Sequence, residues 1–411
     1  MPKRGSVLLR ALGIAVAVAF VLSVTGTVSI ADNKGGQDED RFIVFFDDKS
    51  AMHPAKRFVK QKGGDVLSEF GIIRGMAVRL GKDEVSGLKG IKGVRAVRPD
   101  VKIFAADAEL DSSWGVKRIG AGTVHGYNRG QGVNVVIVDT GVDYTHPDLD
   151  ENYAGGYDFV NNDNDPMDDN GHGTHVAGIA AAEDNGAGVV GVAPEASVYA
   201  LKVLDEEGTG YMSTLIAALD WCLQRFSPDD RVVVNMSLTA TTDPGPEVHN
   251  AFKAAYEAGM VLVAAAGNSG WFVDLPILSI LGYPDTIAYP AKYDEVIAVG
   301  ATDNRDRRPY WSSTGPQMEL AAPGANILSC FPGGYRTISG TSMASPHVAG
   351  TAALVFANGT LQDLNGDGVV NNKDVRLVLR RTADDLGPQG RDTLYGFGLV
   401  DADEAAPPWN L

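Results

Sequence analysis

The stretch that most constrains the fold is residues 339–350, which read Ser-Gly-Thr-Ser-Met-Ala-Ser-Pro-His-Val-Ala-Gly. Ser342 stands among small residues, and Pro346 leads an apolar run that continues to Phe356. Proline is tolerated at a helix start, where the first amide hydrogens have no intrahelical partner. We therefore expect a tight turn that presents Ser342 at the start of a buried helix. A serine hydroxyl is a weak nucleophile and needs a base and an orienting acid from elsewhere in the chain.

Two upstream segments offer these groups. Residues 135–141 form a β-branched run that ends in Asp139 and a glycine, which predicts a buried parallel strand with a carboxylate at its C-terminal end. Residues 170–178 read Asn-Gly-His-Gly-Thr-His-Val-Ala-Gly and place His172 where a loop becomes a helix. The order Asp, His, Ser is one of the three chain orders known for this catalytic arrangement.

These three segments, together with the run Ala-Ala-Ala-Gly-Asn that ends at Asn268, resemble the subtilisin-like serine proteases. The resemblance covers roughly residues 114–404. It implies that Asp139, His172 and Ser342 form a catalytic triad that hydrolyses peptide bonds. It also implies that the Asn268 side chain and the backbone N–H of Ser342 stabilise the oxyanion.

The resemblance further implies protein or peptide substrates, held between two extended segments. These segments are Gly208, Thr209 and Gly210 on one side and Ser237, Leu238 and Thr239 on the other. Thr239 and Ala240 stand where the family often has glycines, which leaves the pocket width open. Ser269, which follows the oxyanion asparagine, carries no acid to favour basic side chains. We therefore expect broad specificity for apolar or uncharged residues.

Strand-like and helix-like stretches alternate along the chain, which predicts an α/β protein with right-handed crossovers. The expected strands are 41–46, 65–70, 75–80, 94–99, 135–139, 198–203, 231–235, 261–265 and 296–301, and the expected helices are 53–62, 82–89, 213–223 and 246–258. With the resemblance, this pattern implies a subtilisin-like three-layer fold. Its mostly parallel central sheet is flanked by helices and preceded by a small α+β domain.

The order of segments indicates a secreted, calcium-dependent enzyme that is made as a precursor. Residues 1–31 combine basic, apolar and small-x-small regions in the manner of a signal peptide. Residues 32–106 resemble the family's inhibitory propeptide, and residues 107–411 are the expected catalytic domain. We expect self-cleavage between about residues 103 and 111. A retained membrane anchor and an independent binding domain are the alternatives for the first two segments, but no stable anchor is expected.

The charge is large and unevenly distributed. The net charge of −17 argues against nucleic-acid binding. Residues 41–105 carry 14 basic and 7 acidic residues, or +7, whereas residues 106–411 carry 17 and 41, or −24. Opposite charges favour association of the two parts. We therefore expect the freed propeptide, the chain's own folding chaperone, to remain bound as an inhibitor.

Three acidic stretches suggest Ca²⁺, which takes six to eight oxygen ligands. The stretch from 363 to 374 matches a calcium loop, an insertion into the protease, through Asp363, Asn365, Asp367, Val369, Asn371 and Asp374. A second stretch, with Asp158, Asn161, Asp163 and Asp165, resembles the aspartate-rich loop of thermitase-like members of the family. A third, Asp148 with Asn185 in the loop 183–189, resembles the family's tight calcium site.

Several alternatives stay open at this point. Cys222 and Cys330 are the two cysteines and either pair or remain buried free thiols. The apolar insertion 270–288 either packs as core or shapes a substrate pocket. His175 and His347 stand beside catalytic residues, where a structural hydrogen-bonding role is favoured. A zinc site is disfavoured, because His172 and His175 are three residues apart without the glutamate and third ligand that a zinc protease requires.

Three rival functions are weighed against the protease. The loop 363–374 could be half of a dockerin, but only one such loop is found and residues 375–386 fit the family's late helix. Gly340, Ser342 and Ala344 approximate an esterase elbow, but esterases place the acid and histidine after the serine. A catalytically inactive adhesion protein is the third rival.

Overall fold

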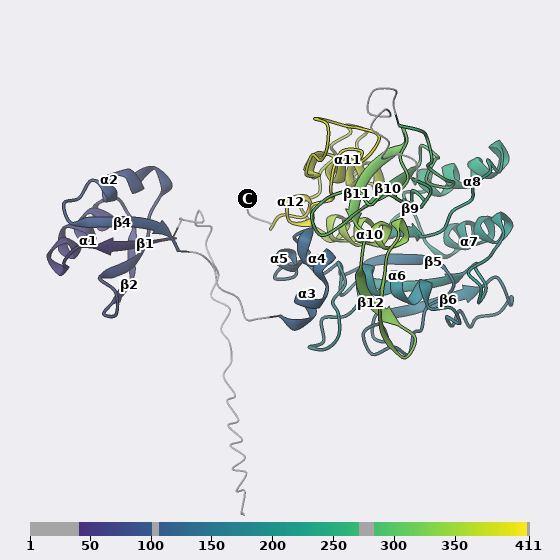
Figure 1. The fold of residues 1–411 in the computed structure, drawn as a ribbon, viewed down its shortest axis with the longest axis horizontal. Helices are drawn as coiled ribbons and strands as arrows, with labels where there is room; N and C mark the ends of the chain where they lie inside the picture. The colour runs from purple at the N-terminus through teal and green to yellow at the C-terminus, as the bar shows by residue number, and fades with distance from the viewer. Residues whose placement is uncertain (1–40, 101–106, 271–282, 409–411) are drawn as a thin grey trace, which may run out of the picture. The chain divides into compact units, whose positions relative to one another are not determined.

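The computed structural model describes residues 41–100, 107–270 and 283–408. The chain divides into two compact units, Met1–Ala105 and Ala106–Leu411 (Figure 1). The predicted signal peptide and most of the apolar insertion, residues 271–282, lie outside the described residues. Within the described ranges, no helix has both the length and the apolar character needed to cross a membrane.

The N-terminal unit is the small α+β domain that the sequence predicts. Its antiparallel sheet has the order β2-β3-β1-β4, formed by Asp65–Phe70, Gly75–Arg79, Arg41–Phe46 and Val94–Pro99. Two helices, α1 (Met52–Gln61) and α2 (Val85–Lys89), complete the unit. The predicted helix over 82–89 is split, because its first three residues form a separate 3₁₀ turn.

The second unit is built on a seven-stranded sheet of order β11-β10-β9-β8-β5-β7-β6, in which the paired strands run parallel. In chain order the strands are β5 (Val133–Asp139), β6 (Tyr153–Asp158), β7 (Ser197–Lys202), β8 (Arg231–Met236), β9 (Val261–Ala265), β10 (Val296–Thr302) and β11 (Met318–Pro323). Strands β6 and β11, and the antiparallel hairpin β12 (Ile327–Phe331) and β13 (Gly334–Ile338), were not predicted.

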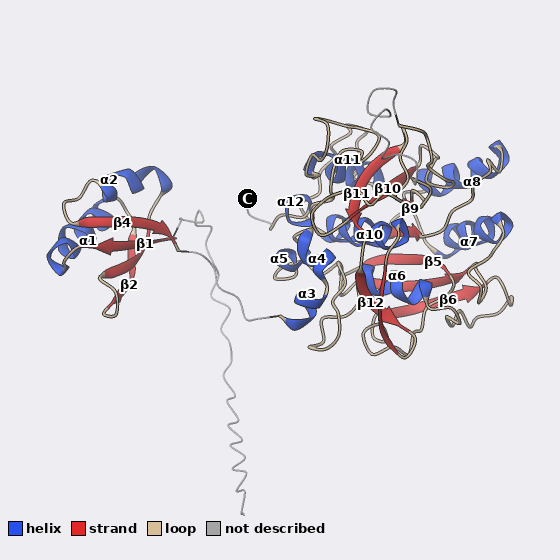
Figure 2. Cartoon of the chain, in the orientation of Figure 1, coloured by secondary structure: helices blue, strands red, loops and turns tan. Residues whose placement is uncertain are grey.

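Helices cover both faces of this sheet (Figure 2). Side chains alternate along β5, so Ile137 packs in one core with α6 (His172–Ala181) and α10 (Thr341–Ala357). Its neighbour Val138 packs in the other core with α7 (Met212–Arg225) and α8 (Pro246–Glu257). The predicted three-layer subtilisin-like fold is therefore confirmed. The remaining described helices of this unit are α3 (Ala108–Ser112), α4 (Trp114–Arg118), α5 (Ala121–Val124), α11 (Asn372–Thr382) and α12 (Ala402–Ala405).

The structure places Ser342 in the first turn of a buried helix, as the sequence predicts, although Pro346 does not lie at the helix start. Helix α10 starts at Thr341, and Pro346 lies inside it. A proline within a helix lacks the N–H that would bond to the carbonyl four residues earlier, which here is the carbonyl of Ser342. That carbonyl instead accepts a hydrogen bond from the Ser237 hydroxyl at 2.8 Å. The helix therefore tolerates the proline because a neighbouring loop supplies the missing donor.

The two cysteines do not pair. Cys222 and Cys330 are both free and buried. Cys222 packs in the core on the α7 side of the sheet, whereas Cys330 packs in the core on the α6 side. The sheet separates them, so of the two alternatives the buried free thiols are correct.

Candidate active site

The carboxylate of Asp139 is held at the C-terminal end of the central strand β5. Its side chain is fully buried, and its Oδ1 accepts the backbone N–H of Thr140 at 2.8 Å. The chain then turns at Gly141, where φ is +109° and an added Cβ would lie 2.5 Å from the carbonyl oxygen of Pro166. Glycine is required at this turn for both reasons.

His172 is the first residue of α6, and its ring reaches back to that carboxylate. The Nδ1 atom lies 2.7 Å from Asp139 Oδ1. An ionised carboxylate only accepts, so Nδ1 carries the hydrogen and Nε2 keeps its lone pair. Burial disfavours the charged imidazole, but the charge and hydrogen bond of Asp139 outweigh it, and Asp168 adds to them. The pKa of His172 therefore lies above its ordinary 6.5.

Asp168 is a residue that the sequence interpretation missed. It is buried, and its two carboxylate oxygens accept hydrogen bonds from the Thr140 hydroxyl, from the N–H groups of Asn170 and Gly171, and from the N–H and hydroxyl of Thr174. It thus ties the turn after Asp139 to the first turn of α6. The local sequence does not reveal this role, because the partners of Asp168 lie both before it, at Thr140, and after it, at residues 170–174.

Lys202 strengthens the same turn from the neighbouring strand. It lies at the end of β7, opposite Asp139, and is only 1% exposed. Its ammonium group donates to the Thr140 carbonyl at 2.7 Å, to Asp169 Oδ1 at 2.6 Å and to the Leu204 carbonyl at 3.1 Å. A buried ammonium group needs such partners, and here they are the loops that flank the histidine.

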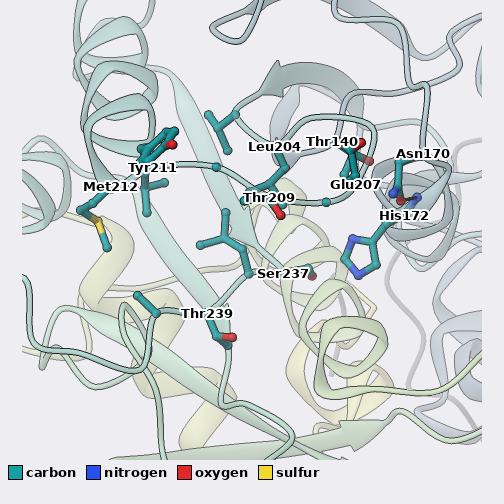
Figure 3. Close-up of a pocket in the computed structure, with 16 residues that line it drawn as sticks. Thr140, Asn170, His172, Leu204, Glu207, Thr209, Tyr211, Met212, Ser237 and Thr239 are labelled. Atoms are coloured by element: carbon teal, nitrogen blue, oxygen red, sulfur yellow. Dashed lines mark hydrogen bonds between the residues drawn. The ribbon is translucent and has the colours of Figure 1, made fainter.

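Ser342 lies in the first turn of α10 and is bonded in both directions to one loop residue. Its hydroxyl donates to the Ser237 carbonyl at 3.1 Å, and its own carbonyl accepts from the Ser237 hydroxyl. Ser237 lines the same cavity as His172 (Figure 3). Ser342 and His172, which the sequence predicts as partners, are carried by two separate helices, α10 and α6, which pack on the same face of the sheet.

Two N–H donors converge beside this serine. Asn268 Oδ1 accepts from the backbone N–H and the hydroxyl of Thr341, each at 3.0 Å, which fixes the orientation of the amide. Its Nδ2 lies 3.5 Å, and the Ser342 backbone nitrogen 3.7 Å, from the point where a Cβ on Gly340 would stand. The absent side chain leaves room for one small acceptor next to both nitrogens.

A cavity of about 530 Å³ extends from His172 between the two predicted substrate segments. Figure 3 shows Thr209 from one segment and Ser237 and Thr239 from the other around it, with Tyr211 just after the first segment. All six predicted substrate residues line the cavity, with Thr140, Asn170, Val203, Leu204, Glu207, Met212, Leu215 and Ala240. Glu207 is the acidic member of this lining, and the sequence interpretation did not use it.

His175 and His347 have backbone partners. His175 Nε2 contacts the carbonyls of Ile327 and Arg336, and His347 Nδ1 contacts the carbonyl of Met343. Burial lowers the pKa of each imidazole to about 4. These contacts agree with the structural role expected for both histidines.

Asp148, in the loop after β5, and Asn185, in the loop 183–189, come together. Asn185 Nδ2 donates to Asp148 Oδ1 at 3.2 Å, and the Val189 N–H donates to Oδ2 at 3.2 Å. Sequence reasoning missed Glu109, 76 residues before Asn185, whose buried carboxylate accepts the N–H of Ala187 at 2.6 Å. Burial and the neighbouring Asp184 raise the pKa of Glu109. A concentration of carboxylates in the interior is suited to a cation.

The other two acidic loops are arranged differently. Asp158 is buried and accepts from Val160 N, Asn161 N and Asn161 Nδ2, while the Asp165 carboxylate accepts from the Tyr144 hydroxyl. Within the described residues, the carboxylates of Asp158, Asp163 and Asp165 do not meet within 4.8 Å of one another.

In the loop 363–374, side chains accept hydrogen bonds from the loop's own backbone. Asp363 accepts from Gly366 and Gly368, Asn365 from Asp367, and Asp367 from Val369. Asp374 is fully buried, caps α11 with Asn371, and accepts from the N–H groups of Leu364, Asn365 and Asn371. The backbone N–H groups of this loop therefore point toward its own acidic side chains.

The comparisons with known proteins agree with this geometry. The family model of the subtilases matches residues 130–398. Subtilisin E of Bacillus subtilis (strain 168) is 37% identical over 402 residues, which are 95% of this chain and 97% of that protein. The alkaline protease of Alkalihalobacillus alcalophilus is 34% identical over 411 residues, covering 95% and 98%. Subtilisin DY of Bacillus licheniformis is 43% identical over 283 residues, covering 68% and 92%.

Replacing Asp168 by Asn should lower the pKa of His172, because one of the two carboxylates that stabilise its imidazolium is removed. The ring would then become neutral at a lower pH than in the wild type. Asp139→Asn should lower the pKa further, since Asp139 also supplies the direct hydrogen bond. The measurement is an NMR titration of the His172 ring carbons, assigned by their loss in His172→Gln. An unchanged midpoint in Asp168→Asn would refute the electrostatic contribution.

Proposed function

This chain belongs to the subtilase family of serine endopeptidases, and from that premise we propose that Asp139, His172 and Ser342 are its catalytic triad. The observation that carries the proposal is the 2.7 Å contact between His172 Nδ1 and the buried Asp139, because it leaves the lone pair on Nε2, where the imidazole can act as a base. Ser342 is bonded in both directions to Ser237, and Ser237 lines the same cavity as His172.

The reaction begins when the Ser342 hydroxyl turns from the Ser237 carbonyl to His172. The imidazole accepts the hydroxyl proton as the oxygen attacks the peptide carbonyl, and it returns that proton to the leaving amine. Asp139 holds the ring and stabilises the imidazolium that forms. Water then takes the place of the serine hydroxyl in a second round of the same steps. His172 accepts a proton from the water as the water attacks the acyl group on Ser342, and returns a proton to the Ser342 oxygen as that bond breaks. Hydrogen bonds of this kind often tighten only when substrate is bound.

The negative oxygen of the tetrahedral intermediate takes its hydrogen bonds from Asn268 Nδ2 and the backbone N–H of Ser342. Both nitrogens flank the space above Gly340, and the two bonds from Thr341 keep the amide oxygen of Asn268 turned away from it. Donors already in place are effective because no reorganisation is needed as the charge develops.

Substrates are protein or peptide chains that lie in the cavity between residues 208–210 and 237–239. The lining is mostly apolar or uncharged, which supports broad specificity for such side chains. Glu207 is exposed at the cavity, where a carboxylate adds attraction for a basic group without defining a closed acidic pocket.

Ca²⁺ is the proposed cofactor, and the residues fit it. The carboxylates of Asp148 and Glu109 both lie against the loop 183–189, which also carries Asn185, so oxygen atoms of the kind that calcium takes are gathered there. The loop 363–374 offers oxygens from Asp363, Asn365, Asp367 and Asp374 with the Val369 carbonyl, and Asp158, Asp163 and Asp165 form a third, more open candidate. Bound calcium would stabilise the fold.

The enzyme is made as a precursor. Residues 1–31 are the proposed signal for secretion to the extracellular space, 32–106 the inhibitory propeptide and 107–411 the catalytic domain. Support comes from the separate α+β unit and from relatives whose similarity covers 95% of the chain. Opposite charges of +7 and −24 should speed association of propeptide and enzyme at low salt.

Replacing Ser342 or His172 by Ala should lower peptide hydrolysis by roughly 10⁴- to 10⁶-fold, because the members of a triad act as a unit. Asn268→Ala should lower kcat by about 10²- to 10³-fold with little change in KM, since its amide acts on the transition state. The measurement is steady-state hydrolysis of a chromogenic peptide, with electrophoresis to follow the precursor.

Ser342→Ala should also accumulate as uncut precursor, and Ser269→Ala serves as the control next to Asn268. Near-wild-type casein hydrolysis by Ser342→Ala would rule out the nucleophile assignment. Cleavage of the mutant precursor by itself would rule out self-processing.

The double variant Asp363→Ala, Asp367→Ala should have a lower melting temperature in calcium and nearly unchanged kcat at mild temperature. The loop precedes α11, which remains anchored to the body because Arg376 bonds to buried Glu319 and to the Asp294 carbonyl. Calorimetry and peptide hydrolysis, each with calcium and with chelator, measure the two effects.

A matched control is Asp229→Ala, Asp230→Ala, which removes two exposed carboxylates from another turn. Its calcium-dependent melting shift should equal that of the wild type. If the 363/367 variant also kept the full shift, this loop would be a solvated acidic turn rather than a calcium site.

A further inference from the structure

Three metal-ligating side chains meet in the interior, outside the catalytic cavity. They are His146, Asp148 and Cys330, which are 3%, 1% and 0% exposed. One potential ligand atom from each lies within 4.8 Å of the others, and within the described residues this is the one such group of three found. The catalytic reaction proposed above uses neither His146 nor Cys330.

The three residues come from two distant segments. His146 and Asp148 lie in the loop after β5, and Cys330 lies on β12 of the β12–β13 hairpin. A Cβ on Gly178 of α6 would lie 2.8 Å from the Cys330 sulfur, so the thiol is packed closely against the helix that begins with His172. The ring of Tyr335, which is partly exposed, stands edge-on to His146 and separates it from solvent.

The imidazole already has the tautomer that a metal ligand needs. His146 Nε2 lies 2.8 Å from the Gly334 carbonyl, which can only accept, so Nε2 carries the hydrogen. Nδ1 therefore carries the lone pair, and it accepts a long 3.1 Å bond from the Asp148 N–H. Metal-bound histidines usually donate their other N–H to a carbonyl or carboxylate in this way.

The donor set selects the class of metal. Calcium takes oxygen ligands, whereas a thiolate and an imidazole with one carboxylate are the ligands of zinc and other thiophilic divalent ions. Tetrahedral zinc with bonds of about 2.0–2.3 Å places its ligand atoms roughly 3.3–3.8 Å apart. The ligand atoms, which lie within 4.8 Å of one another, must therefore approach by about 1 Å when the metal binds.

We propose that Cys330 Sγ, His146 Nδ1 and Asp148 form a site for a thiophilic divalent cation of the zinc class, with water as the fourth ligand. Binding replaces the S–H bond by an S–metal bond and releases the proton to solvent. Asp148 also contacts Asn185 in the loop 183–189, where calcium binding is proposed. A thiophilic metal that is bound by the Asp148 carboxylate would therefore weaken the binding of calcium at that loop. This competition rests on the calcium function proposed above, whereas the thiophilic site itself does not.

The test uses Cd²⁺ as the probe, on full-length protein carrying Ser342→Ala so that self-digestion is prevented. A cadmium–thiolate bond gives an ultraviolet charge-transfer band that cadmium bound only to oxygen lacks. We expect one equivalent of Cd²⁺ to produce this band in the parent protein. Cys222→Ser is the matched control, because Cys222 is an equally buried thiol in the opposite core, and the band should persist in it.

Cys330→Ser should abolish the band, and His146→Gln should weaken cadmium binding at least about 10-fold, as loss of a ligand requires. Near-ultraviolet circular dichroism verifies that each variant is folded, and His146→Gln keeps the test available if the cysteine variant is not. A band that survives in folded Cys330→Ser would overturn the site. Saturating Ca²⁺ should raise the cadmium dissociation constant; a constant independent of calcium would overturn the shared use of Asp148 and leave the protease function untouched.

Discussion

The contact between His172 and the buried Asp139 carboxylate is the interaction on which the functional part of the structure depends. A carboxylate at the end of an interior strand is costly to bury unless it is hydrogen-bonded. The Thr140 N–H and His172 Nδ1 both bond to Oδ1 of Asp139, at 2.8 and 2.7 Å, whereas its buried Oδ2 has no hydrogen-bond partner among the described residues. The histidine can reach it only if the start of α6 is held against the end of β5. Asp168 and Lys202 provide this by bonding to the turn and to the loop before α6.

The position of Ser342 depends on a hydrogen bond that replaces one missing from its helix. Pro346 removes a helical hydrogen bond, and Ser237 supplies the replacement donor to the Ser342 carbonyl. Thr341 meanwhile fixes Asn268, so that one helical turn positions both the nucleophile and its partner donor. Ser237 lines the cavity and bonds to the nucleophile, and Thr341 holds Asn268, so the small residues Gly340, Thr341 and Ser342 lie where these parts of the site meet.

Prediction from the sequence succeeded where the signal was local and failed where it was not. The β-branched run 135–138 predicts a buried strand, whereas β6 contains Gly155 and Gly156 and gives no such pattern. Asp168 and Glu109 could not be assigned, since their partners are brought to them by tertiary folding. The sequence predicts Ser342 at the start of α10, but it does not reveal the donor from another loop that allows Pro346 to lie inside the helix.

The central claim is that His172, held by Asp139, activates Ser342, and covalent labelling tests it most directly. A fluorophosphonate forms a phosphorus–oxygen bond with an activated serine and releases fluoride. Peptide mass mapping should find a single adduct on Ser342, at a rate that rises as His172 loses its proton and that falls sharply in His172→Ala. An adduct on another serine, or equal labelling of Ser342 without the histidine, would contradict the account.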